Sequence, residues 1–241
     1  MTPLPQILTG VLLVGIAVAP PDPLTSSLRD ARRTYDLSAA IELRASMREA
    51  LKASPSPELL RLLTDVCLLE AELHRIEFEN LPEAHRQDRR ELGALIDEAA
   101  EEGLATLTEL DPDSDTFRLQ ADLLGTLIRS KFRGKKYRRA MESAAQQALD
   151  LDPGNALALV SLAKPHVFHP SRTEDDLALG LELLDRALAL DSDLEPARLL
   201  RGRALAELGR TDEAIADWQS ALDRNPDCSP ARSLLEEHPR P

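Results

Sequence analysis

The sequence lacks the residues and motifs from which most catalytic and disulfide-bonded sites are built. Two cysteines in 241 residues cannot form a disulfide framework or a cysteine-rich metal site, and aromatic side chains make up only 3% of the chain. No G-x-S-x-G, phosphate-binding glycine loop, H-E-x-x-H or C-x-x-C motif is present. We therefore expect no enzyme activity and no cofactor.

Basic residues are also outnumbered, with 29 Lys and Arg against 42 Asp and Glu, and the formal net charge is −13. Nucleic acid is therefore not an expected partner. No segment alternates apolar and polar residues for long enough to predict a strand, whereas leucine and alanine are abundant. These absences favour an all-α fold.

One apolar run stands apart, at residues 7–18, and prolines at 20, 21 and 23 follow it. The run is shorter than the roughly 20 residues that a membrane-spanning helix needs. Residues 1–19 resemble a secretory signal peptide, which predicts an exported protein, periplasmic or extracellular. No Lys or Arg precedes the run, so an apolar N-terminal segment or an uncleaved anchor stays the alternative. Without a signal peptide the location would be cytoplasmic.

What the chain contains instead is a repeated helix ending. Ala-Leu-Asp-Leu-Asp-Pro at 148–153 returns as Ala-Leu-Ala-Leu-Asp-Ser at 187–192 and as Ala-Leu-Asp-Arg-Asn-Pro at 221–226. Recurrence of this kind indicates one supersecondary unit that stacks on copies of itself. Such a stack has a long surface rather than a deep central core, which favours binding over catalysis.

The unit at residues 195–228 is the most regular and spans 34 positions. Gly202 and Ala214 are small enough to let two antiparallel helices approach closely. Trp218 can fill the space between these helices, and Pro226 ends the second one. In its length and at these positions the unit resembles a tetratricopeptide repeat.

Further positions of this unit follow from the resemblance. We expect Gly209 to end the first helix and Thr211 to cap the second. Arg198 and Arg201 stand where the family usually has large apolar residues. That departure suits an end repeat with one face partly exposed to water.

The resemblance implies an all-α fold, a right-handed α–α superhelix of about four to five helix pairs in one domain, residues 24–241. Its best repeats are residues 114–153, 156–194 and 195–228. Upstream of them, Ser56 is the expected N-cap of an earlier long helix.

The resemblance also implies a non-catalytic scaffold that binds a protein or peptide in a groove along the inner helices. The family's pattern places four side chains in that groove, namely Leu157, Val160, Leu199 and Arg203. This mixture suits an apolar or amphipathic helix as the bound segment. An envelope-associated helper of a transport or assembly machine is the alternative function.

Basic residues gather in one segment despite the acidic balance of the chain. Residues 129–139 hold Arg129, Lys131, Arg133, Lys135, Lys136, Arg138 and Arg139, with Phe132 and Tyr137 between them. The simpler interpretation is a solvated turn, in which basic residues at a helix C-terminus are favourable. The alternative is an anionic partner, such as an acidic protein segment, a lipid headgroup or a surface glycopolymer. This alternative is based on Arg138 and Arg139, which would lie at the start of the next helix, where the helix dipole makes basic residues unfavourable.

His166 and His169 form an H-x-x-H pair between two predicted helices. We expect the first helix to end at Pro165 and the second to begin with a capping box at Thr173. The loop at 164–176 is then an alternative site for a metal ion or a small molecule. No third ligand is fixed, so we assign no metal site.

Two more pairs of residues are of types that can form sites, the two cysteines and Glu70 with His74. Cys67 lies on the apolar side of an early helix and Cys228 follows the last repeat, so we expect a buried Cys67 and a free Cys228 without a disulfide. Glu70 and His74 share one helix face, which is typical of a solvated surface, and we assign them no site.

Overall fold

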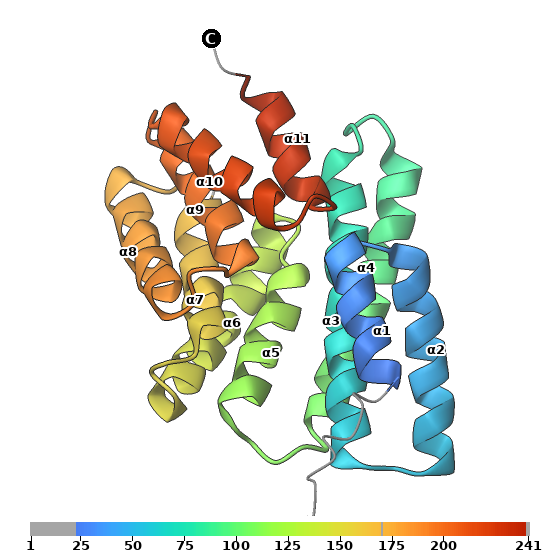
Figure 1. The fold of residues 1–241 in the computed structure, drawn as a ribbon. Helices are drawn as coiled ribbons and strands as arrows, with labels where there is room; N and C mark the ends of the chain where they lie inside the picture. The colour runs from blue at the N-terminus through green and yellow to red at the C-terminus, as the bar shows by residue number, and fades with distance from the viewer. Residues whose placement is uncertain (1–22, 170, 240–241) are drawn as a thin grey trace, which may run out of the picture.

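The computed structural model describes residues 23–169 and 171–239, which form eleven helices and no strand (Figure 1). The predicted signal peptide, residues 1–19, lies outside the described residues. Consecutive helices pack in pairs, so the all-α prediction of four to five helix pairs is confirmed for this part of the chain. None of these helices is both long enough and apolar enough to cross a membrane.

Five helix pairs are followed by one single helix. The pairs are α1 (Pro23–Thr34) with α2 (Leu37–Ala53), α3 (Pro57–Asn80) with α4 (Arg86–Leu107), α5 (Ser114–Thr126) with α6 (Lys131–Leu151), α7 (Ala156–Phe168) with α8 (Glu174–Leu190), and α9 (Glu195–Glu207) with α10 (Thr211–Arg224), and the last helix is α11 (Ser229–Glu237).

The odd-numbered helices from α3 onward form an inner layer of the stack. α3 contacts α5, α5 contacts α7, and α7 contacts α9, while each even-numbered helix packs against the odd-numbered helices before and after it. Fully buried alanines such as Ala145, Ala163 and Ala187 allow these helices to approach closely. The core is therefore a series of apolar clusters along the stack rather than one centre.

Side-chain caps fix the starts of several helices. The Leu59 N–H donates a hydrogen bond of 3.2 Å to Ser56 Oγ, so the predicted N-cap of α3 is confirmed. Thr173 and Asp176 form the predicted capping box at the start of α8. These caps satisfy amide groups that have no partner within the helix.

The connection between α9 and α10 differs from the prediction. Gly209, with a φ of 75°, ends α9, and the N–H groups of Gly209 and Arg210 donate to the carbonyls of Ala206 and Leu205. This is a Schellman arrangement, which needs a residue with positive φ after the helix. Thr211 is then already the first residue of α10, and Arg210 occupies the N-cap without a side-chain hydrogen bond. The predicted cap at Thr211 is therefore wrong.

Helix α7 does not end at Pro165, contrary to the prediction, but continues to Phe168. A proline inside a helix costs about 3 kcal/mol because it removes one backbone hydrogen bond. Here Pro165 and Val167 are buried, and a Cβ added to Gly180 of α8 would lie 3.2 Å from the Val167 side chain. This close packing offsets the lost hydrogen bond. The predicted loop at 164–176 is thus partly helical at both ends.

The two arginines at apolar positions of the last repeat are partly exposed and ion-paired. Arg201 donates hydrogen bonds of 2.7 Å to each carboxylate oxygen of Asp217 and of 2.7 Å to Asp185. Arg198 lies 3.7 Å from Asp217, which is 5% exposed. Both arginine side chains stay partly exposed, as expected for a face partly open to water, and one buried carboxylate compensates both charges.

Helix α2 buries the face of α3 that carries Glu70 and His74, each only 3% exposed. Arg44 of α2 lies 3.1 Å from Glu70 and 2.7 Å from Glu98 of α4. The predicted solvated face is therefore wrong. Arg44 supplies the opposite charge without which a buried carboxylate is costly.

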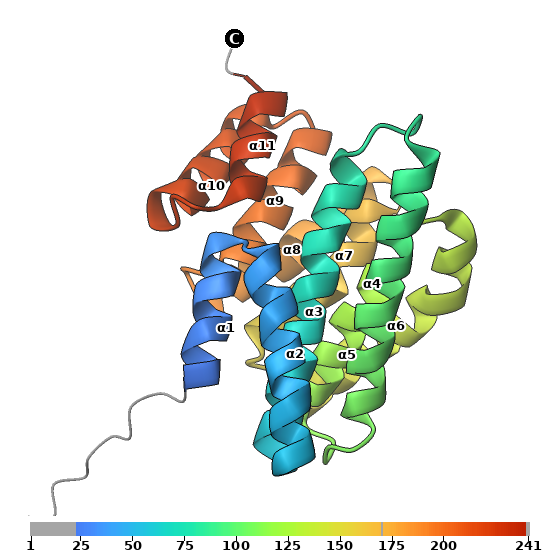
Figure 2. The ribbon, with the colours of Figure 1, turned by 90° about the vertical axis from the view of Figure 1, so that its right-hand side faces the viewer.

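The first and last parts of the stack touch each other. Tyr35, between α1 and α2, donates its hydroxyl proton to Glu195 at the start of α9 and packs against buried residues of both regions. Arg33 lies 3.0 Å from Asp227, and the Asn225 side chain donates to the Arg33 carbonyl at 3.1 Å. Figures 1 and 2 show the connection before α11 next to the connection between α1 and α2. The helical stack is thus closed on itself.

Both cysteines are free thiols and both are buried. The burial of Cys67 confirms the prediction. Cys228 is covered by the contact between the two ends, with its Sγ 3.6 Å from the Tyr35 hydroxyl. Burial raises the pKa of both thiols, so neither is an activated thiolate at neutral pH.

Candidate functional site

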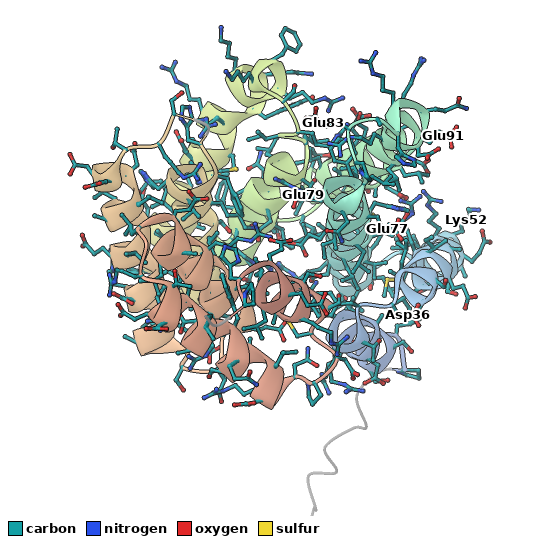
Figure 3. All side chains as sticks on the ribbon, turned by 90° about the horizontal axis from the view of Figure 1, so that it is seen from above. Asp36, Lys52, Glu77, Glu79, Glu83 and Glu91 are labelled. Atoms are coloured by element: carbon teal, nitrogen blue, oxygen red, sulfur yellow. The ribbon has the colours of Figure 1, made fainter. Side chains whose placement is uncertain are left out.

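The inner helices line a groove with a cavity volume of about 580 Å³. Its walls come from α3, α5, α7 and α9, and residues of α4, α6 and α11 complete them. Seen from above, Glu79 lies on the side of α3 that faces the groove and Glu77 lies on the other side (Figure 3). The groove is therefore the concave surface that a stack of helix pairs offers to a ligand.

Apolar side chains from four helices form part of the groove surface. They include Ile76 and Phe78 of α3, Val160 of α7, Leu199 of α9 and Leu234 of α11. Two of the four groove residues predicted from the sequence, Val160 and Leu199, are among them, and Arg203 also lines the groove. Leu157 lies outside it, because the groove follows the later turns of α7, from Val160 to Phe168.

The groove is basic although the chain is acidic. Seven Lys and Arg side chains line it against three Asp and Glu, whereas the whole chain has a net charge of −13. The basic residues are Arg75, Arg89, Arg129, Lys131, Arg138, Lys164 and Arg203, and the acidic residues are Glu72, Glu79 and Asp122. An excess of one sign of charge in a groove raises the local concentration of a ligand with the opposite charge.

Two arginines of the groove hold its α3 wall in place. Arg75 lies 2.8 Å from Glu79 and donates a hydrogen bond of 2.7 Å to the Gly125 carbonyl of α5. Arg89 donates at 2.8 Å to the Phe78 carbonyl and lies 4.0 Å above the Phe78 ring. Both guanidinium groups are therefore engaged within the protein.

Lys164 is neutralised by the buried carboxylate of Asp122, 2.7 Å from its Nζ. Ser161 donates at 2.7 Å to the same carboxylate, and Arg118 lies 3.5 Å from it. Burial by itself raises the pKa of Asp122, but the positive charges of Lys164 and Arg118 outweigh it and the pKa lies below its usual range. Asp122 therefore stays ionised at neutral pH.

Apart from Arg89, which is held by backbone carbonyls, three groove cations have no carboxylate partner among the described residues, namely Lys131, Arg138 and Arg203. Arg203 lies 5.8 Å above the ring of Phe168. The charges of these three side chains are free to bind an anion that enters the groove.

The basic segment 129–139 is the start of a helix rather than the predicted turn. Helix α6 begins at Lys131, because the Arg133 N–H donates to Ser130 Oγ at 3.3 Å and the Gly134 N–H donates to the Ser130 carbonyl at 2.8 Å. Ser130 thus satisfies amides at this end of the helix. Its effect prevails over the unfavourable position of basic side chains near the positive end of the helix dipole.

Helical spacing divides the basic segment among three faces. Arg129 and Arg133 bind Asp97 of α4, with Arg133 at 2.7 and 2.6 Å from its two oxygens. Lys131 and Arg138 line the groove. The third face is exposed to solvent and carries Phe132, Lys135, Lys136 and Arg139.

The two histidines of the H-x-x-H pair have different partners. His166 Nδ1 lies 3.7 Å from Asp176, and His169 Nδ1 accepts a hydrogen bond of 3.1 Å from the Ser171 N–H. Within residues 23–169 and 171–239, no group of three or more His, Cys, Asp or Glu side chains lies close enough to hold a metal ion.

The α3 and α11 walls of the groove were not predicted from the sequence. Phe78 lies in a helix far upstream of the regular repeats, and Leu234 lies beyond the last one. The i, i+4 pair of Arg75 and Glu79 was a local signal for an ordered helix face, but not for a groove. These residues meet because the stack curves back on itself.

Comparison with known proteins identifies the fold. No protein family model and no curated protein matches the sequence. The chain is similar to the solved structure of TTC0263, a thermophilic TPR protein of Thermus thermophilus, at 19% identity and a TM-score of 0.59, over 89% of this chain and 98% of that one. YrrB, described as a TPR protein with an unusual peptide-binding site, matches at 12% identity and a TM-score of 0.43, over 89% and 98%. The chain has the fold of the tetratricopeptide repeat proteins, a superhelix of stacked helix pairs.

Proposed function

We propose that the protein is a non-catalytic scaffold whose groove binds a segment of another protein that combines apolar and acidic side chains. The observation that supports this most directly is the sign of the groove, which is lined by seven basic and three acidic residues in an acidic chain. An acidic segment is attracted to this surface and repelled by most of the rest of the protein.

The groove offers both kinds of contact that such a segment needs. Ile76, Val160 and Leu199 present apolar surface, and Lys131 and Arg138 present charges without a carboxylate partner. A cavity of about 580 Å³ has room for several side chains of a helix or an extended chain. Burial of apolar side chains and charge-assisted hydrogen bonds would both contribute to the binding free energy, as in other helix-in-groove complexes.

A direct titration tests this function. The probes are two fluorescently labelled amphipathic peptides with the same leucines, one with Glu and the other with Lys at the polar positions. Anisotropy should show binding of the acidic peptide and little binding of the basic one. Equal binding of both, or none, would contradict the proposal.

The chain offers a matched pair of variants for the same titration. Arg138→Glu reverses a charge that lines the groove, whereas Arg139→Glu reverses the next residue, which does not line it. We expect Arg138→Glu to lower the affinity for the acidic peptide about tenfold or more and Arg139→Glu to change this affinity only slightly. If both variants reduce binding equally, the affinity depends on the net charge of the protein and the groove is not the binding site.

The proposal does not depend on where the protein is located or on which larger assembly its partner belongs to. Export stays a prediction from residues 1–19, which lie outside the described residues. A role as a helper in envelope transport or assembly depends on that prediction. Both are compatible with a groove that binds an acidic segment.

A further inference from the structure

The outer face of α6 carries a second basic surface, separate from the groove. Phe132, Lys135, Lys136 and Arg139 are spaced i, i+3, i+4 and i+7, so they lie on one side of the helix. All four are exposed, and none of them lines the groove. We call these four residues the outer stripe of α6.

Phe132 is the clearest anomaly of the outer stripe. Its exposed fraction is 79%, and every other exposed large apolar side chain of the described residues lies between 40% and 58%. Side chains of a helix tilt toward its N-terminus, so Phe132, the second residue of α6, projects toward and past the helix start. An aromatic ring in this position keeps most of its contact with water and is available for an apolar partner.

The three cations of the outer stripe are equally uncompensated. Lys135 and Arg139 have no hydrogen bond or ion pair from their side chains to the described residues, and Lys136 contacts only the ring of Tyr137, at 4.5 Å. Two other basic residues of the same segment, by contrast, are bound by Asp97.

We propose that the outer stripe binds the surface of an anionic lipid bilayer, with the Phe132 ring in the interface and the three cations at the headgroups. Basic residues beside an exposed aromatic ring are the combination that holds a helix at such a surface. The stripe is about 10 Å long, too small for the roughly 800 Å² per partner of a stable protein interface. A bilayer is fluid, so such a small contact needs no matching shape. This surface is independent of the groove and goes beyond the proposed function.

Vesicle co-sedimentation tests the proposal with the full chain. The probes are phosphatidylcholine vesicles alone and vesicles in which about one third of the lipid is phosphatidylserine. We expect the protein to sediment with the anionic vesicles at low salt, to be released as salt rises, and not to bind phosphatidylcholine. Equal binding to both vesicles, or none to either, would overturn the proposal.

Matched variants separate the outer stripe from the charge of the whole protein. Lys135→Glu/Lys136→Glu should reduce vesicle affinity more than tenfold, whereas Arg29→Glu/Arg186→Glu makes the same change in net charge on α1 and α8 and should leave more than half of the binding. Phe132→Ser should weaken binding several-fold without altering charge. Circular dichroism shows that each variant is folded.

The remaining outcomes also decide the matter. If the two double variants lose binding equally, long-range attraction is responsible and the outer stripe is not a site. If Phe132→Ser binds as the parent protein does, the ring is not inserted and the proposal fails. If the protein does not bind anionic vesicles but binds polyglutamate through Lys135 and Lys136, the surface recognises acidic protein and the lipid proposal is wrong.

Discussion

The Tyr35 hydroxyl donates a hydrogen bond to the Glu195 carboxylate across 160 positions of sequence. The Asn225 side chain donates to the other oxygen of the same carboxylate at 2.8 Å. One acidic group at the start of α9 therefore receives the connection between α1 and α2 from one side and the end of α10 from another. It joins the first helix pair to the last repeat.

Replacing Tyr35 with Phe should lower the free energy of unfolding by about 1–3 kcal/mol. The ring keeps its packing, but the part-buried Glu195 carboxylate loses a donor. Urea denaturation measures the change. Tyr137→Phe is the control, since the Tyr137 hydroxyl makes no hydrogen bond with the described residues and its removal should have little effect.

The contribution of Tyr35 should also depend on pH. Burial and the negative charge of Glu195 raise the pKa of the Tyr35 hydroxyl above its usual range. The stabilisation is then fully present below the unfolded pKa of about 10 and is lost as the pH rises above it. The stability difference between Tyr35→Phe and the parent should therefore shrink in alkaline solution. A difference that stays constant would show that the hydroxyl contributes through packing alone.

Gly202→Ala should destabilise the last repeat by about 1–3 kcal/mol or more. A Cβ at Gly202 would lie 2.3 Å from Nε1 of Trp218, whose ring is fully buried. Thermal or urea unfolding measures the loss. The same substitution at Gly134 of α6 should instead be neutral or stabilise by about 0.5–1 kcal/mol, because its nearest neighbours would be 3.6 and 3.7 Å away. Equal effects at the two sites would contradict the close helix contact.

Asp122→Asn should cost about 1–3 kcal/mol at neutral pH, because Lys164 loses its carboxylate partner, whereas Arg118 keeps Asp115 at 3.6 Å. The folded pKa of Asp122 is lowered, so its stabilisation is present above the unfolded pKa of about 3.9 and is lost as the pH falls toward the folded value. The gap between variant and parent should narrow below about pH 4. Urea titrations at several pH values measure it, with the exposed Asp30→Asn as control.

Local signals in the sequence were sufficient to predict the helix pairs. Ser56 and Thr173 are caps that act over three residues, and Gly202 faces Trp218 at the spacing of a close helix hairpin. Gly209 ends α9 through its own backbone conformation. Each of these effects acts within one helix or between neighbouring helices, so a sequence pattern can report it.

The errors arose where a distant contact outweighs a local preference. Pro165 lies inside α7 because Val167 is packed against α8, and the basic start of α6 is stabilised by Ser130 and by pairing with Asp97. Ser130 is a local cap signal that the interpretation of this segment as a solvated turn did not use. The burial of Glu70 depends on Arg44 from another helix, and no local pattern indicates it.

The groove could be predicted only in part for the same reason. Val160, Leu199 and Arg203 follow from the repeat pattern of α7 and α9. Phe78 and Leu234 enter through the curvature of the whole stack, which depends on the angles between successive pairs. These angles result from the packing of many small residues and cannot be read from a sequence pattern. The groove residues of α3 and α11 could therefore be identified only from the structure.

The contact between Tyr35 and Glu195 also limits how this protein can change in length. An open array of hairpins gains or loses units during evolution, because each unit contacts only its neighbours. Here an extra hairpin inserted between α2 and α9 would move Glu195 away from Tyr35 by the width of a packed helix layer, about 10 Å. Duplication or deletion of a hairpin, the ordinary source of variation in repeat proteins, would break the contact between the two ends of the stack. A change in the number of hairpins between these two residues would therefore cost the protein this contact.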